Sequence, residues 1–176
     1  MKTSNGGNEV SLTMHNYVFV SEKTAFYEKF DGIFMLMKNA VIEQVYALWD
    51  CIDNRWFDDA PMLIQTSAGI LSVNVRSEKY IAIGWNDIPL SEKPVWFDEM
   101  EIETIKGLNW TEDLEWRADN KVSHILKEQI DSILFHHEDI EWGVGVGLKT
   151  KSGKCLWIYD AGDVISAKVE RSVNHG

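Results

Sequence analysis

Residues 49–61 read WDCIDNRWFDDAP, and three short apolar segments follow them along the chain. The first two are MLIQT (62–66) and ILSVNV (70–75), separated by SAG (67–69), and the third is YIAIG (80–84). Alternating apolar residues on both sides of a short turn that contains glycine are typical of a β-hairpin. We therefore expect an antiparallel β-meander that follows an acidic, aromatic loop.

The second strand of this meander alternates strictly between apolar and polar residues. In a strand, successive side chains point to opposite faces of the sheet. The pattern predicts one face in the core and one in solvent. The core face would carry Leu71, Val73 and Val75, and the outward face Ser72, Asn74 and Arg76.

A weaker copy of the same plan returns near the C-terminus. Ile42 aligns with Ile130 and Val45 with Ile133, and the turn at 67–69 aligns with Lys-Ser-Gly at 151–153. Each half then reads as an apolar segment, an acidic loop, a hairpin and a third strand. The recurrence predicts an internal duplication, with two related meanders packed into one β-rich body.

Two segments fit both a helix and a strand. Residues 40–49 and 129–137 have apolar residues near a 3.6-residue period, but they are rich in side chains that favour strands. The duplication favours strands, because each segment would then be the first strand of its meander. We also expect a short helix near 121–127 and an amphipathic helix over at least about 22–31, with Gly32 as its weak point or end.

The predicted fold class is α+β and β-dominated, with an N-terminal helix and two antiparallel meanders. We divide the chain into an N-terminal helical segment (1–37), a first meander with an aromatic and acidic linker (38–117), and a second meander (118–176). A length of 176 residues is enough for these parts to share one core. We therefore expect one compact domain.

The composition limits the classes of partner. The formal net charge is −11, so phosphate groups repel the surface, which argues against nucleic acid and anionic membranes as partners. No apolar run approaches the length of about 18 residues that a membrane helix needs. The N-terminus lacks the apolar region of a signal peptide, and the two cysteines are not in a metal or redox spacing. We expect a cytoplasmic protein with free thiols.

No motif predicts catalysis, a metal site or a cofactor. His136 and His137 are adjacent, so on a strand they would point to opposite faces and could not readily share a metal ion. The GxGxG run at 143–147 is not followed by a helical pattern, so it does not read as a phosphate loop. We expect these glycines to leave room for a large ring such as that of Trp157.

The remaining signal is an acidic surface interleaved with tryptophan. Buried tryptophans beside fixed carboxylates are one way for an acidic protein to hold a basic one. The alternative is a solvated acidic turn that only keeps the protein soluble. The predicted partner-binding residues are Asp53, Trp56, Asp58, Asp59, Trp85, Asp87, Trp96, Asp98 and Glu99.

The chain resembles a family of small, uncharacterised bacterial proteins with the pattern WFDDAP, then a glycine turn, then WN, then P-x-W. The matching residues are 56–61, the hairpin at Gly69, 83–86, 94–98 and 114–116, and the resemblance covers roughly 38–170. Proteins of this size and acidity also resemble the immunity proteins of contact-dependent inhibition and polymorphic toxin systems. The resemblance implies no enzymatic role and no catalytic residues.

We therefore expect a non-enzymatic immunity protein that binds a toxin domain, such as a basic nuclease, and occludes its active site. The first alternative is a small-molecule-binding or regulatory β-rich module with tryptophan rings in a cleft. The second is a hydrolase that uses the aspartate cluster and a metal. The partner's identity and the oligomeric state are left open by the sequence.

Overall fold

A computed structural model describes residues 18–57, 60–76, 79–91, 94, 113–136, 143–162 and 164–171. Two helices lie in this part of the chain, α1 (Lys23–Met37) and the 3-10 helix η1 (Asn120–Ile125). The strands are β1 (Ile42–Asp50), β2 (Arg55–Trp56), β3 (Met62–Thr66), β4 (Gly69–Arg76), β5 (Tyr80–Trp85), β6 (Leu114–Ala118), β7 (Ile130–His136), β8 (Gly145–Thr150), β9 (Lys154–Asp160) and β10 (Ile165–Arg171). The predicted β-dominated α+β class is confirmed.

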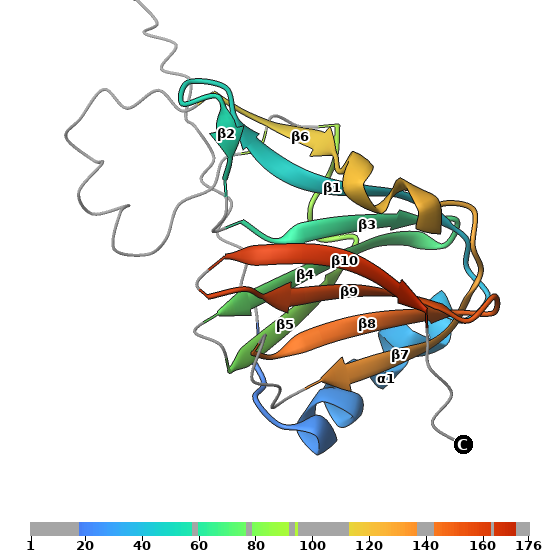
Figure 1. The fold of residues 1–176 in the computed structure, drawn as a ribbon. Helices are drawn as coiled ribbons and strands as arrows, with labels where there is room; N and C mark the ends of the chain where they lie inside the picture. The colour runs from blue at the N-terminus through green and yellow to red at the C-terminus, as the bar shows by residue number, and fades with distance from the viewer. Residues whose placement is uncertain are drawn as a thin grey trace, which may run out of the picture.

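The strands form two antiparallel sheets (Figure 1). The first sheet has the order β2-β1-β3-β4-β5, and β6 also pairs with β1. The second sheet has the order β10-β9-β8-β7. The strand predictions at 40–49 and 129–137 are confirmed as β1 and β7, and η1 forms where we predicted a short helix.

One hydrophobic core fills the space between the sheets. Leu71, Val73 and Val75 of β4 reach it from the first sheet, and Leu156 and Ile158 of β9 from the second. Figure 1 shows α1 beside β7, at one side of this sandwich, and η1 at the other side, above β10. The two open sides of the sandwich are thus approached by different elements.

Aromatic packing holds α1 in place. Phe26 is completely buried, and its ring centroid lies 5.0 Å from that of Phe135 on β7. The Tyr27 hydroxyl donates to the Ile133 carbonyl at 3.3 Å and accepts the Phe135 N–H at 3.2 Å. The predicted amphipathic helix is present and runs past Gly32 to Met37, so of the two possibilities at Gly32 the helix end is excluded. Buried Met37 anchors the last turn, and this outweighs the low helix propensity of glycine.

Backbone hydrogen bonds join the two sheets near the starts of β1 and β7, around an antiparallel bridge between Val41 and Gln129. Asn39 (φ 69°) and Lys127 (φ 70°) turn the chain into the two strands in the same way. The flanking hydrogen bonds form two pairs, and in each pair the same bond is made once from each segment. The Asn39 N–H donates to the Ile130 carbonyl at 2.9 Å, as the Lys127 N–H does to the Ile42 carbonyl at 2.7 Å. The Ile42 N–H donates to the Glu128 carbonyl at 2.9 Å, as the Ile130 N–H does to the Ala40 carbonyl at 2.8 Å. This local twofold pattern matches the alignment of Ile42 with Ile130, while the duplication itself stays a prediction.

Two glycines are required by rings that pack on the backbone. A Cβ at Gly69 would lie 2.7 Å from Cζ2 of Trp85, and one at Gly147 would lie 2.7 Å from Cζ3 of Trp157. Gly147 is directly opposite Trp157 in the β8–β9 pair. The prediction that this glycine leaves room for the Trp157 ring is confirmed.

The first sheet differs from the prediction at one of its faces. Ser72 and Asn74 are completely buried, so the prediction that they face solvent is wrong. The chain after β5 folds back over this face, where Asp87 accepts a hydrogen bond from the Ser72 hydroxyl at 2.9 Å and Ile88 is buried. The side chain of Arg76 lies outside the described part of the chain.

Two additional strands form in segments where no strand was predicted. The predicted loop at 50–61 contains β2, which pairs with the end of β1 through Trp49 and Trp56. The predicted linker contains β6, which pairs with β1 over Tyr46–Asp50. Both strands supply partners for backbone groups of β1: β2 continues the edge of β1 where its pairing with β3 ends, and β6 covers the opposite edge. No helix in the described ranges is long and apolar enough to span a membrane.

Candidate functional site

The β1–β2 hairpin is built around the carboxylate of Asp50. Its Oδ1 atom accepts the N–H groups of Ile52 at 2.8 Å and Asp53 at 3.1 Å, which closes the turn. Asn54 has a φ of 53°, a conformation that asparagine tolerates well, and it leads the chain into β2. Asp50 therefore shapes this turn through its own hydrogen bonds.

Two tryptophans stiffen the hairpin. The rings of Trp49 and Trp56 meet edge to face, with 4.9 Å between their centroids. The guanidinium group of Arg117, on β6, lies 4.3 Å from the centroid of the Trp49 ring, within range of a cation–π interaction. The hairpin is thus held in one orientation relative to β6.

The tip of the hairpin combines an exposed apolar side chain with several charges. Ile52 is 61% exposed. Asp53 forms an exposed ion pair with Arg55 at 3.3 Å, and Glu115 forms one with Arg117. Exposed pairs of this kind contribute at most about 1 kcal/mol to folding, so these charges remain available to a partner.

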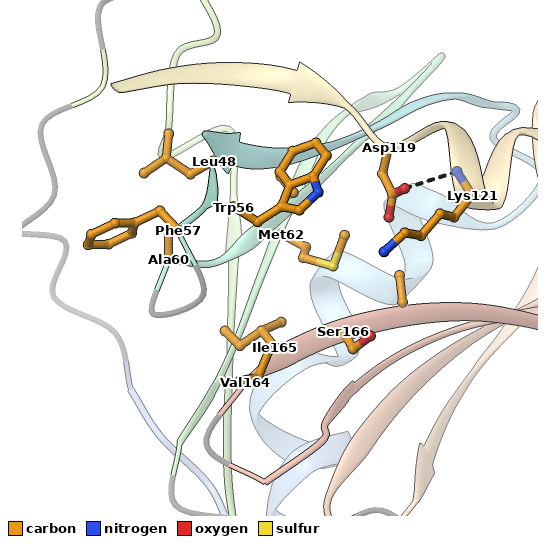
Figure 2. Close-up of a pocket in the computed structure, with 12 residues that line it drawn as sticks. Leu48, Trp56, Phe57, Ala60, Met62, Asp119, Lys121, Val164, Ile165 and Ser166 are labelled. Carbon is orange, nitrogen blue, oxygen red and sulfur yellow. Dashed lines mark hydrogen bonds between the residues drawn. The ribbon is translucent and has the colours of Figure 1, made fainter. Parts of the chain in front are cut away.

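A pocket with a volume of about 110 Å³ lies where β1 separates from β3, facing β10 (Figure 2). The first sheet and the chain after β2 contribute mainly apolar side chains: Ala47, Leu48, Trp56, Phe57, Ala60 and Met62. The opposite wall comes from β10 and the residue before it: Val164, Ile165, Ser166 and Ala167. Asp119 and Lys121 form a polar end.

The polar end of the pocket is organised by the start of η1. Asp119 is only 8% exposed and caps this short helix, since its Oδ1 atom accepts the Lys121 N–H at 3.0 Å. The Lys121 side chain is exposed. Figure 2 shows its ammonium group extending toward the pocket below the Asp119 carboxylate. The pocket therefore has an apolar end and an end that carries both signs of charge.

The predicted site residues are divided between two edges of the first sheet. Asp53 and Trp56 belong to the β1–β2 hairpin, and Trp56 also lines the pocket. Trp85 ends β5, at the other edge of the sheet, where it packs against the main core, and Asp87 binds Ser72. The described structure therefore does not bring these four residues together. The other predicted residues lie outside the described residues: Asp58, Asp59, Trp96, Asp98 and Glu99.

The two cysteines are unsuited to nucleophilic chemistry. Burial raises the pKa of the Cys155 thiol to about 12. Partial burial and then the carboxylates of Glu115 and Asp113 raise the pKa of the Cys51 thiol. Both thiols are free, and both stay protonated at neutral pH, whereas the thiolate is the reactive form. Within the described ranges, no cluster of three or more His, Cys, Asp or Glu residues is arranged to hold a metal ion.

Sequence reasoning missed Ile52 and Asp119 as candidate site residues. Ile52 could have been found from the sequence, because it is an isolated isoleucine between Cys51 and Asp53 in an acidic turn. It belongs to no alternating apolar pattern of a strand. Asp119 carried a weaker signal, an acid directly before a short helix, which also fits its capping role. Its place in a pocket depends on β10, which is distant in the sequence.

Neither a protein-family model, nor a curated protein, nor a solved structure matches this chain. The resemblance to the bacterial family and to immunity proteins therefore stays a prediction.

Proposed function

We propose that this protein is a cytoplasmic immunity protein that binds a toxin domain and neutralises it by covering the toxin's active site. We propose a basic nuclease as the toxin. Such an enzyme holds nucleic acid with basic groups, and a chain with a net charge of −11 complements them. Charge complementarity of this kind speeds association and favours the correct partner.

The observation that carries the proposal is the tip of the β1–β2 hairpin. Ile52 is an exposed apolar side chain on a turn fixed by Asp50, with the carboxylates of Asp53, Asp113 and Glu115 on the same or the neighbouring segment. Protein interfaces combine an apolar anchor with a polar rim, and a few central residues supply most of the affinity. The hairpin offers both parts of such an interface.

The pocket does not favour the alternative of a small-molecule-binding module. Pockets for small ligands and cofactors usually enclose about 300–1,000 Å³. The pocket beside the hairpin has a volume of about 110 Å³, which is closer to the size of one amino-acid side chain. A pocket of this size suits one side chain of a protein partner better than a whole cofactor.

The test begins with the tagged protein, purified from its native cells and analysed for a stoichiometric partner by mass spectrometry. The partner's nuclease activity is then measured with and without added protein. We expect a basic partner whose activity is lost at a one-to-one ratio. A partner that keeps its activity in the complex, or the absence of any stoichiometric partner, would contradict the proposal.

Two matched variants locate the interface. Ile52→Ala removes the proposed anchor, and we expect affinity to fall by roughly 30-fold, the effect of about 2 kcal/mol. Leu36→Ala is the control, because Leu36 is 58% exposed but belongs to α1, away from the hairpin. Equal effects of the two substitutions would show that the hairpin is not part of the interface.

Asp53→Lys should slow association with the partner and weaken the dependence of the association rate on salt.

A further inference from the structure

We propose that the pocket between β10 and the β1–β3 junction accepts the side chain of a lysine or arginine from a protein partner. That the partner is a toxin rests on the function proposed above. The volume of the pocket, its walls and its charged end favour a cationic side chain whatever the partner is.

The volume of the pocket fits a single side chain. At about 110 Å³ the pocket is well below the about 300–1,000 Å³ of pockets that take small ligands and cofactors. A space of this size suits the end of one long side chain, such as that of lysine or arginine. It is too small for a nucleotide or a cofactor.

The walls of the pocket suit a guest with an apolar stem and a charged head. Trp56 on one side and Ile165 on the other give the pocket accessible apolar surface, Leu48 and Met62 in the same lining are almost completely buried, and Asp119 and Ser166 lie toward the far end (Figure 2). Lysine and arginine commonly lay their methylene groups along apolar surfaces while the head finds polar partners. The pocket is divided in the same way, with apolar walls for the methylene stem and a charged end for the head.

Asp119 supplies the charge that a cationic head requires. Asp119 is buried, and the one hydrogen bond that caps η1 engages Oδ1. A carboxylate has about four acceptor positions, so this cap leaves acceptor capacity on the side chain. A charge-assisted bond to a buried carboxylate is about twice as strong as a neutral one.

Trp56 adds a second feature that favours a cation. In Figure 2 its indole ring lies between Leu48 at the apolar end and Asp119 at the polar end. Aromatic faces attract ammonium and guanidinium groups, most strongly when water is excluded. A norleucine side chain would gain the apolar contacts but neither of these electrostatic ones.

Lys121 competes with such a guest. Its ammonium group points toward the pocket, yet no ion pair within 4.0 Å joins it to Asp119 among the described residues. The side chain is exposed, so it can move into solvent when a guest enters. The proposal therefore predicts opposite effects for substitutions at the two neighbouring positions.

The test uses the full chain and capped Gly-X-Gly peptides in which X is lysine, arginine, norleucine or glutamate. Binding is followed through the indole N–H signal of Trp56 in ¹H–¹⁵N NMR spectra, identified with a Trp56→Phe variant. We expect saturable shifts in the millimolar range with the lysine and arginine peptides only. Equal binding of the norleucine peptide, a preference for the glutamate peptide, or no binding at high millimolar concentration would each overturn the proposal.

Three substitutions complete the test. Asp119→Asn keeps a residue that caps helices well but removes the charge, and should weaken binding of the basic peptides by roughly tenfold or more. Lys121→Met keeps the apolar stem and should strengthen binding by roughly two- to tenfold. Ala167→Leu fills the pocket and should abolish binding of every peptide. Thermal unfolding of each variant verifies that it is folded.

The signs of these effects decide between guests. An apolar guest would leave affinity unchanged on Asp119→Asn, and an acidic guest would reverse both effects, so either outcome refutes the assignment. The peptide measurements need no toxin. They can therefore fail while the toxin complex is found, or succeed while no toxin is found, and the two failures are distinguishable.

Discussion

Replacing Gly147 with alanine should destabilise the protein, whereas the same change at Gly32 should stabilise it. A Cβ at Gly147 would lie 2.7 Å from Cζ3 of Trp157, 2.8 Å from its Cη2 atom and 2.9 Å from Sγ of Cys155. Carbon atoms in favourable contact are about 3.5–4.0 Å apart, so the ring would have to move by almost 1 Å. A Cβ at Gly32 would meet no atom within 4 Å.

The magnitudes follow from these contacts. Overpacking of this kind costs about 1–3 kcal/mol, and we expect about 2 kcal/mol for Gly147→Ala. Alanine is favoured over glycine by about 1 kcal/mol in a helix interior, so Gly32→Ala in α1 should gain about that much. For a protein of this size, 1 kcal/mol changes Tm by about 2–4 °C. Tm should therefore fall by about 4–8 °C for Gly147→Ala and rise by about 2–4 °C for Gly32→Ala.

Thermal unfolding followed by circular dichroism, with urea denaturation as a second measure, tests both values. A Trp157→Leu background serves as the control, because removing the ring should remove most of the cost of Gly147→Ala. If Gly147→Ala is as stable as the native protein, or keeps its full cost without the ring, the packing of Trp157 on β8 is not what requires glycine there. A loss of stability from Gly32→Ala would contradict the account of α1.

Three more predictions concern stability and reactivity. Phe26→Ala should cost about 3–5 kcal/mol in urea denaturation, because the buried ring joins α1 to β7. Glu128→Gln should cost about 0.5–1 kcal/mol at neutral pH by removing the ion pair with Lys154 at 2.7 Å. Because the hydrogen bond with Lys154 lowers the pKa of Glu128 from its ordinary value, the difference from the native protein should vanish as the pH falls through that lowered pKa. Mass spectrometry should show Cys155 alkylated only as fast as the chain unfolds, and Cys51 without unfolding.

Several features of the fold followed from local patterns in the sequence. The alternation in residues 62–84, the glycine turns and the recurrence of Ile42 and Val45 as Ile130 and Ile133 predicted β-strands where periodicity alone suggested helices. The strand prediction is confirmed for β1 and β7. A strand needs a neighbouring strand to pair with, and the hairpin that follows each segment provides it. The pairing of Gly147 with Trp157 was predictable for a similar reason, since a short turn sets the register of a hairpin.

The candidate site could be predicted only in part. Acidic and aromatic residues near the β1–β2 hairpin were evident from composition, and Asp53 and Trp56 lie there. Trp85 and Asp87 share that composition, but β5 is at the other edge of the sheet and both residues make internal contacts. Composition describes which side chains are present and contains no information about which edge of a sheet they reach.

The sequence by itself determined the class of the protein, the hairpins and the acidic surface, because turns, alternation and charge are properties of neighbouring residues. Only the tertiary structure decided that β6 pairs with β1, that Ser72 and Asn74 are buried, and that Asp119 faces β10 across a pocket. Each of these depends on segments that are distant in the chain. Such contacts form when distant segments pair their free backbone groups and cover each other's apolar surface during folding. A local sequence pattern does not specify which distant segments will do so.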